Sequence, residues 1–187
     1  MASLKTITQF KSRLAGGGAR PNLFEVNIND FKFADAWDNE TFQFLCKAAA
    51  LPASTITPVE IPFRGRILKV AGDRTFETWT ITVINDADFA IRSAFEKWMN
   101  TINKMDDATG LTNPEQYQKD AMVHQLDRDG SILRSYKFWD IYPTNISAID
   151  LSYETVDTIE DFTVEMQVHW WEAFKGTSPI AGGEDVR

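Results

Sequence analysis

The sequence is poor in the residues that metal and redox chemistry need. Its 187 residues include one cysteine, Cys46, and two histidines, His124 and His169. A single cysteine excludes an internal disulfide framework and a cysteine-rich zinc site, and its neighbours Phe44 and Leu45 predict a buried thiol. Neither histidine has a cysteine or a carboxylate pair at metal-ligand spacing. We therefore expect both to be polar strand residues rather than ligands or bases.

Sequence motifs of catalysis and cofactor binding are also lacking. No G-x-S-x-G, phosphate-binding glycine loop or H-E-x-x-H motif occurs, and Gly16-Gly17-Gly18 is not followed by the Lys-Ser/Thr of a P-loop. The segment 127–130 starts like a calcium loop but offers Phe138 where position twelve needs an acidic ligand, so it predicts a turn. We expect no enzymatic activity, no metal and no cofactor.

Charge and hydropathy narrow the classes of partner. The formal net charge is -8, and an acidic chain is repelled by phosphates, which argues against ordinary nucleic-acid binding. No apolar run approaches the roughly 18 residues that cross a bilayer. Residues 1–20 lack the apolar stretch of a signal peptide. These features predict no membrane association and folding in a reducing cytoplasm.

The composition, 43% hydrophobic and 25% charged, predicts one folded domain. Residues 1–20 are polar and contain three consecutive glycines at 16–18, which indicates a flexible N-terminal arm, and residues 176–187 indicate a flexible C-terminal tail. The folded body is expected over residues 21–175.

Alternation with a period of two predicts several half-buried strands. In the clearest segment, 160–170, Phe162 and Val164 belong to one face while Thr163 and Glu165 belong to the other. Asp129-Gly130 predicts a hairpin, because both central turn positions tolerate positive φ. The other strand candidates are residues 23–29, 64–71, 75–85, 121–126 and 131–141.

One long amphipathic helix is predicted over residues 89–105, where apolar residues recur at spacings of three and four. Asp86 or Asp88 can cap its first turn, and Gly110 lies beyond its end. Strands with a single helix predict a mainly β (α+β) fold, a sandwich or barrel of antiparallel strands with the helix laid across it.

The sequence surroundings of four of the six tryptophans indicate where these side chains lie. Trp79, Trp98 and Trp170 fall on apolar faces and are expected in the core. Trp37 lies in the polar loop 30–40, where no apolar face is evident. It either anchors a protein contact or caps its own loop.

Six segments in a fixed order carry a family resemblance. They are ARPNLF at 19–24, CKAAALP at 46–52, VAGDRTF at 70–76, WTITVIND at 79–86, YPTNI at 142–146, and the strand from Phe162 to Trp171 with Glu172. In this order they resemble the tail tube proteins of contractile-tailed, T-even-like bacteriophages, which are related to the inner tube proteins of contractile injection systems. The resemblance covers residues 20–172. The loop 30–40 and the tail after Lys175 are longer than the family pattern, which could place them on the tube exterior or against the sheath.

The resemblance implies a structural virion protein of the tail tube, assembled in the host cytoplasm. Such proteins form stacked hexameric rings, and each subunit gives four strands to one barrel that conducts the genome. A barrel of about 24 strands has a diameter on the order of 40 Å. The implied partners are further copies of the chain, the tail sheath protein, the baseplate hub and tail terminator proteins, the tape-measure protein, and viral DNA that passes without specific binding.

Two surfaces are candidates for these roles. The polar faces of strands 75–85 and 160–170 either line the lumen or face outside solvent. Their residues are Thr78, Thr80, Thr82, Thr163, Glu165, Gln167 and His169. The segment 52–74 is expected to reach an adjacent subunit or ring and meet acidic residues there, and its alternative is an exposed hairpin with solvated charges. Its charged residues are Arg64, Arg66, Lys69, Asp73 and Arg74.

Two other functions remain compatible with the sequence. One is the inner tube of a phage-derived contractile injection system or bacteriocin, which would share the fold and the stacking. The other is a small-molecule-binding β-barrel similar to a lipocalin, which would need an enclosed apolar pocket.

Overall fold

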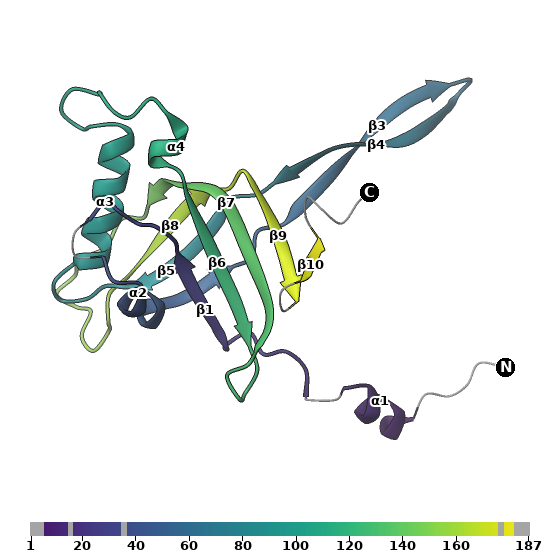
Figure 1. The fold of residues 1–187 in the computed structure, drawn as a ribbon, viewed down its shortest axis with the longest axis horizontal. Coiled ribbons are helices and arrows are strands. Elements are labelled where there is room, and N and C mark those ends of the chain that lie inside the picture. The colour runs from purple at the N-terminus through teal and green to yellow at the C-terminus, as the bar shows by residue number, and fades with distance from the viewer. Residues whose placement is uncertain (1–5, 15–16, 35–36, 176–177, 182–187) are drawn as a thin grey trace.

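The computed structural model describes residues 6–14, 17–34, 37–175 and 178–181 (Figure 1). Its strands are β1 Phe24–Ile28, β2 Cys46–Ala50, β3 Ser54–Phe63, β4 Arg66–Phe76, β5 Trp79–Ile84, β6 Lys119–Leu126, β7 Ile132–Ile146, β8 Asp161–Gln167, β9 Trp170–Lys175 and β10 Ser178–Ala181. Its helices are α1 Ile7–Arg13, α2 Asn39–Leu45, α3 Ala90–Ile102 and α4 Pro114–Tyr117. Every strand pairing is antiparallel, so the predicted mainly-β fold class is confirmed.

The strands form two layers that share the long strand β7. The first layer has the order β2-β5-β8-β7, and the second has the order β1-β6-β7-β9-β10. β7 pairs with β9 from Ser135 to Trp139 and with β8 from Tyr142 onward. Asp140, between the two stretches, has a φ of 54°, where the strand bends from one layer into the other. We call β2, β5, β8 and residues 142–146 of β7 the four-strand layer.

The core lies between the two layers and beneath α3. Trp79 of β5 stacks on Phe138 of β7 with ring centroids 4.6 Å apart, and both side chains are fully buried. α3 covers one end of the layers, as Figure 1 shows. Its Phe95 and Trp98 side chains are fully buried. The indole N–H of Trp98 donates to the carbonyl oxygen of Tyr117 at 2.7 Å. The core assignment of Trp79 and Trp98 is thus confirmed.

The predicted amphipathic helix is confirmed with a shorter C-terminal end. Asp86 accepts a hydrogen bond from the Ala90 N–H at 3.1 Å, which supports the predicted N-terminal cap. The helix stops at Ile102 instead of reaching Met105, whose side chain is exposed. The chain turns back there because the Lys104 N–H donates to the Thr109 carbonyl at 2.8 Å.

Two predicted strands are interrupted. Segment 75–85 breaks at 77–78 between β4 and β5, and segment 160–170 breaks at 168–169 between β8 and β9. At the second break the His169 N–H donates to the Trp139 carbonyl at 3.2 Å, and the chain passes into the second layer. Trp170 is therefore half-buried against Trp139 and lies outside the core, contrary to the prediction.

The other predicted strands are confirmed with shifted ends. β1 and β6 match segments 23–29 and 121–126, whereas β4 and β7 are longer than predicted. The 129–130 hairpin is present between β6 and β7, but only Gly130 has a positive φ, of 81°. The turn spans more residues than expected, since the Asp127 N–H donates to the Ser131 carbonyl at 2.8 Å.

Trp37 is half-buried and Cys46 is buried. Trp37 stacks on Phe31 with centroids 4.1 Å apart and contacts Phe42 and Phe95, so the loop does have an apolar face. This packing supports the loop-cap interpretation of Trp37. Cys46 is 6% exposed, which confirms the predicted buried thiol, and burial raises its pKa to about 12.

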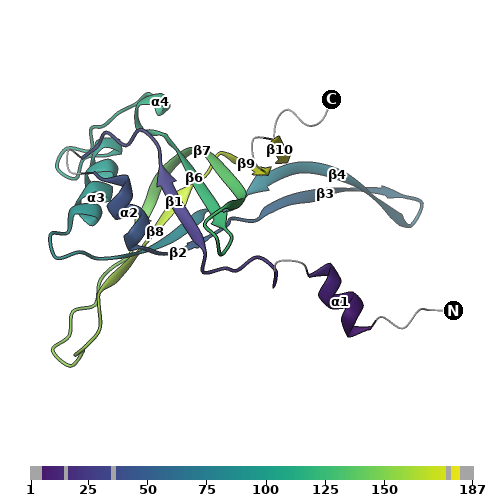
Figure 2. The ribbon, with the colours of Figure 1, turned by 60° about the horizontal axis from the view of Figure 1, so that its bottom comes forward.

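The terminal segments contain regular structure where none was expected. Residues 7–13 form α1 with a Thr6–Gln9 capping box, and residues 178–181 form β10 against β9. α1 stands apart from the two layers in Figures 1 and 2. The remaining residues of the predicted arm and tail lie partly outside the described residues, so their flexibility stays a prediction. None of the helices in the described segments is long and apolar enough to span a membrane.

Candidate assembly surfaces

One face of the four-strand layer is polar and partly exposed. Its side chains align in rows across the strands because antiparallel register places opposite residues on the same face. One row runs Ala50, Thr80, Glu165 and Asn145, and a second runs Ala48, Thr82 and Thr163. The opposite face is fully buried in the core. Its residues are Trp79, Ile81, Val83, Phe162, Val164 and Met166.

The structure thus brings five of the seven lumen candidates, Thr80, Thr82, Thr163, Glu165 and Gln167, to this face and places the other two elsewhere. Gln167 continues the polar face along β8, where it pairs with Tyr142. Thr78 lies outside the strands at the β4–β5 break, and His169 lies at the exposed bend before β9. Thr78 and His169 were predicted as strand residues, and that part of the prediction is wrong, because the chain leaves the layer at both positions.

Both borders of the four-strand layer carry a single partner strand in the described residues. β2 pairs only with β5, and residues 142–146 of β7 pair only with β8. Pro143 lies on this second border, a position that suits proline because it has no N–H to donate. Open strand borders invite pairing with another chain.

The hairpin β3–β4 projects from the two layers at one end of the molecule (Figure 1). Its tip is the turn Arg64-Gly65, with φ values of 47° and 82°. Gly72 sits where the strands approach closely, since a Cβ there would lie 2.4 Å from the Thr57 carbonyl oxygen. Seven apolar side chains are exposed on this hairpin. They are Ile56, Val59, Ile61, Phe63, Ile67, Leu68 and Val70.

The charged inter-subunit candidates all lie on this hairpin. Lys69 forms an ion pair with Glu60 at 3.3 Å, and Arg64 lies over the ring of Phe63 at 5.3 Å. Arg66, Asp73 and Arg74 are exposed on β4. The exposed hairpin that was weighed as the alternative is therefore present, and whether it contacts another subunit stays a prediction.

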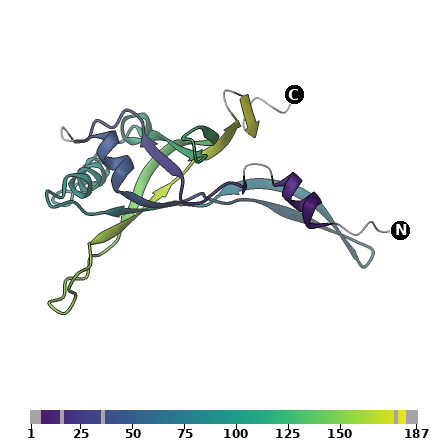
Figure 3. The same cartoon turned by 90° about the horizontal axis from the view of Figure 1, so that it is seen from below.

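A second projection, which the sequence analysis missed, is the loop 148–160 between β7 and β8. It lies at the end opposite to the hairpin, as Figures 1 and 3 show. Leu151, Tyr153, Val156 and Ile159 are all at least 74% exposed. The loop contains four acidic residues and no basic one. Four apolar residues in an irregular acidic segment were the signal that could have revealed it.

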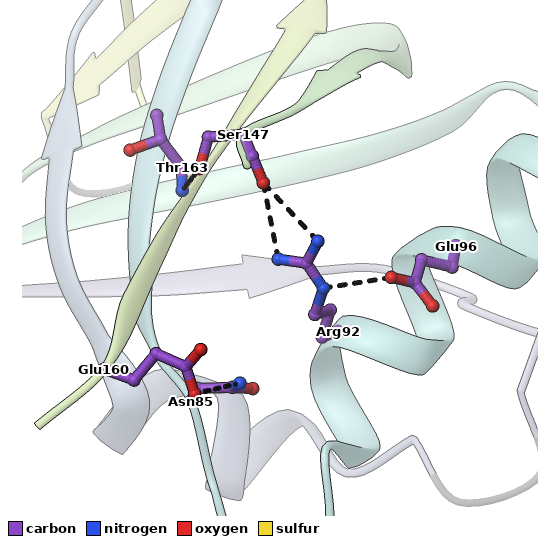
Figure 4. Close-up of polar contacts among 6 residues, drawn as sticks. All are labelled: Asn85, Arg92, Glu96, Ser147, Glu160 and Thr163. Atoms are coloured by element: carbon purple, nitrogen blue, oxygen red, sulfur yellow. Dashed lines mark hydrogen bonds and ion pairs between the residues drawn. The ribbon is translucent and has the colours of Figure 1, made fainter. Parts of the chain in front are cut away.

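The base of this loop is held by hydrogen bonds from three elements (Figure 4). Arg92 of α3 donates to the Ser147 carbonyl oxygen and forms an ion pair with Glu96 at 2.9 Å. On the other side, the Asn85 side chain donates to Glu160 at 3.1 Å. The Thr163 N–H donates to the Ser147 hydroxyl at 2.9 Å and closes the base. Both ends of the loop are thus fixed while its tip is exposed.

No chemical centre accompanies these surfaces in the part of the chain that the structure describes. There, no group of three or more His, Cys, Asp and Glu side chains is arranged to hold a metal ion. A polar recess of about 380 Å³ at the hairpin base is lined by Arg74, Asp140, Gln167 and His169, among others. The described residues thus present open strand borders and two exposed projections, features that are typical of structural proteins whose surfaces contact other chains.

Comparison with known proteins places the chain within that class. Residues 19–173 match the family model described as phage tail tube protein, and the chain belongs to this family. It is a structural, non-enzymatic family, and the chain is a component of the virion tail tube.

Two curated relatives are similar over most of their length. The tail tube protein gp19 of Enterobacteria phage T4 is 34% identical over 159 residues, covering 84% of this chain and 93% of gp19. The tail tube protein of Serratia phage KSP90 is 25% identical over 167 residues, covering 88% and 94%.

Two solved structures share the fold. A chain from the anti-feeding prophage baseplate has a TM-score of 0.62 at 12% identity, covering 84% of this chain and 96% of that one. A chain from the sheath–tube complex of an extracellular contractile injection system in its extended state has a TM-score of 0.59 at 13% identity, covering 92% and 99%.

Proposed function

We propose that this protein forms hexameric rings that stack into the inner tail tube, and that the tube conducts the viral genome into the host. The four-strand layer is the unit of the tube wall. Six such layers, joined border to border, give a barrel of about 24 strands with a diameter on the order of 40 Å. That bore leaves room for duplex DNA.

The open borders of the four-strand layer carry this proposal. In the described residues, β2 and the 142–146 stretch of β7 each lack a partner on one side. Pairing β2 of one subunit with β7 of the next gives each border a partner strand, apart from the missing N–H of Pro143, and leaves the barrel of four-strand layers without an open border. A lipocalin-like barrel would instead have its borders paired within one molecule.

The polar face of the four-strand layer suits a lumen for DNA. It presents threonine, alanine, asparagine and Glu165, with no basic residue among the row positions. Lys47, at the β2 border, is paired with Asp161 at 2.6 Å. A neutral to acidic wall offers phosphates little to bind, so DNA can slide without being held.

The proposed partners follow from this role. Copies of the chain form the tube, and the tail sheath, tail terminator, baseplate hub and tape-measure proteins contact it. The terminator and baseplate would cap the tube at its two ends, because a stack of identical rings leaves one unsatisfied surface at each end. Assembly takes place in the host cytoplasm.

Cysteine cross-linking tests the ring directly. Ala48 or Ala50 on β2 and Asn145 on β7 all lie on the polar face but at opposite borders of one subunit, about 14 Å apart by strand spacing. A disulfide cannot span this distance, so the pair Ala48→Cys/Asn145→Cys, or Ala50→Cys/Asn145→Cys, can join only different subunits. The native Cys46 can stay, because with a pKa of about 12 it remains a buried thiol.

Oxidation of the concentrated double variants is expected to give a covalent ladder that ends at the hexamer, with rings visible by negative-stain microscopy. Each single variant is the control and should give no ladder, because one border then lacks its thiol. If both double variants stay monomeric on denaturing gels, and light scattering of the unmodified protein gives the mass of one subunit, the ring is refuted.

A further inference from the structure

The hairpin β3–β4 and the loop 148–160 extend opposite halves of the same layer. β3 and β4 continue β2 and β5 past Ala50 and Trp79, whereas the loop joins β7 to β8 beyond Ile146 and Asp161. Ile84, at the far end of β5, pairs with Asp161, so the two projections leave the layer at opposite ends. Figures 1 to 3 show this arrangement, with the hairpin on one side and the loop on the other.

The two projections are complementary in charge. The loop carries Asp150, Glu154, Asp157 and Glu160 without a basic residue, and the hairpin carries four basic and two acidic residues. On the hairpin, Lys69 is already paired with Glu60. The tip residues Arg64 and Arg66 have no ion-pair partner within the described segments. Opposite charges on two projections of one chain favour a contact between copies.

Both projections also expose apolar surface that a contact would cover. At the hairpin tip, Phe63 is 66% exposed and Ile67 is 59% exposed. On the loop, Leu151 is 87% exposed and Tyr153 is fully exposed. A recess of about 430 Å³ lies within the loop, lined by Leu151 and Ile159 together with Asp150 and Glu160. Removing such large side chains from water is favourable, and acidic residues beside the recess suit an arginine-flanked aromatic side chain.

We propose that the loop 148–160 receives the tip of the β3–β4 hairpin from a second copy of this chain in the neighbouring ring. The Phe63 ring enters the recess beside Leu151 and Ile159, and Arg64 and Arg66 pair with Asp150 and Glu154. Donor and acceptor differ, so the contact is head-to-tail and repeats without closing, which builds a stack. The hydrogen bonds from Arg92 to the Ser147 carbonyl oxygen hold the base of the loop in place before the hairpin binds.

This inference rests on the proposed tube and names the contact that stacks its rings. A charge exchange tests it. The variants are Arg64→Glu/Arg66→Glu on the hairpin and Asp150→Lys/Glu154→Lys on the loop, and a third protein carries both pairs. Asp106→Lys/Glu115→Lys, with two acidic residues replaced on exposed segments elsewhere, is the matched control.

The readout is the critical concentration for tube formation, measured by sedimentation and microscopy. Each two-residue variant is expected to raise it at least about tenfold, the control to leave it within about twofold, and the combined variant to recover to within about threefold of the original protein. All four variants should keep the circular dichroism spectrum and melting temperature of the original, because the altered side chains are exposed.

Three outcomes would overturn the inference. In the first, the loop variant polymerises at the same critical concentration as the original protein. In the second, the combined variant does not recover. In the third, the loop variant forms normal tubes that no longer bind sheath protein, and the loop is then a sheath contact. In each case the β2–β7 cross-links would still form, so the proposed ring would stand. If neither double-cysteine variant gives a cross-linked ring and the original protein scatters light as a single subunit, the ring and the stacking contact are refuted together.

Discussion

The guanidinium of Arg92 donates two hydrogen bonds, each 3.4 Å long, to the carbonyl oxygen of Ser147, which lies 55 residues further along the chain. The same group pairs with Glu96 and lies over the ring of Phe162 at 5.3 Å. One side chain of α3 therefore contacts the end of β7, the start of the loop 148–160 and the core residue of β8. The loop 148–160 therefore starts at the point where Arg92 holds the backbone of Ser147 against α3.

Replacement Arg92→Ala is expected to lower the free energy of unfolding by about 1 kcal/mol, because the Ser147 carbonyl and the Phe162 ring lose their partner. Hydrogen exchange should accelerate at the amides of Thr163 and Asn85, which bond to the two ends of the loop. Lys97→Ala, on the exposed side of α3, is the matched control and should change stability by less than about 0.5 kcal/mol. Equal exchange rates in the two variants would contradict the claim that Arg92 holds the base of the loop in place.

The sequence predicted β5 and β8 of the four-strand layer well because one face of each is entirely core, whereas β2 and the 142–146 stretch of β7 were not among the predicted strands. Trp79, Ile81 and Val83 alternate with threonines on β5, and this alternation survives in the structure without exception. The break at 168–169 escaped prediction for the same reason. Val168 is buried and His169 is exposed, so the side-chain pattern keeps its period of two while the backbone turns into the other layer.

Features that depend on distant contacts were not predictable from local pattern. The apolar face that receives Trp37 is made by Phe31, Phe42 and Phe95, which approach only when the loop folds over α3. The positive φ of Asp140, where β7 changes layer, likewise depends on pairing with two different strands. For the candidate surfaces, alternation identified the polar face of β5 and β8, and basic residues identified the hairpin. The loop 148–160 has no periodicity to mark it.

His124 is expected to make stability depend on pH on the mildly acidic side. Burial lowers the pKa of His124, against a smaller opposing effect of Glu25, which pairs with it across β1 and β6. The folded protein therefore binds the proton less readily than the unfolded chain, whose histidine has a pKa of about 6.5. Stability is unaffected well above pH 7 and falls as the pH drops below about 6.5. In His124→Gln, where the amide can still bond to Ser135, the decline between pH 7 and pH 5 should be smaller.

Chemical denaturation of both proteins at several pH values measures this difference. His169→Gln is the matched control, since His169 is exposed at the bend before β9. Parallel pH profiles for the original protein and His124→Gln would contradict the assignment. Carboxylates whose pKa is lowered, such as Asp38 and Asp129, lose their protons below this window and cancel in the comparison.

The lumen assignment predicts a defect in delivery without a defect in assembly. Thr163 and Glu165 lie on the polar face of β8, opposite Thr82 and Thr80, and β8 is an interior strand of the four-strand layer. In a phage carrying Thr163→Arg/Glu165→Arg, tubes should form, but every ring would present twelve guanidinium groups to the phosphates if the ring is a hexamer. Such groups hold DNA electrostatically, so infectivity per particle should fall at least about tenfold, with DNA retained in adsorbed particles. Thr163→Gln/Glu165→Gln, which is similar in size but neutral, should deliver its genome normally. Equal infectivity of the arginine and glutamine phages would place this face on the outside of the tube, because the arginine charges can slow delivery only on a surface that the DNA passes.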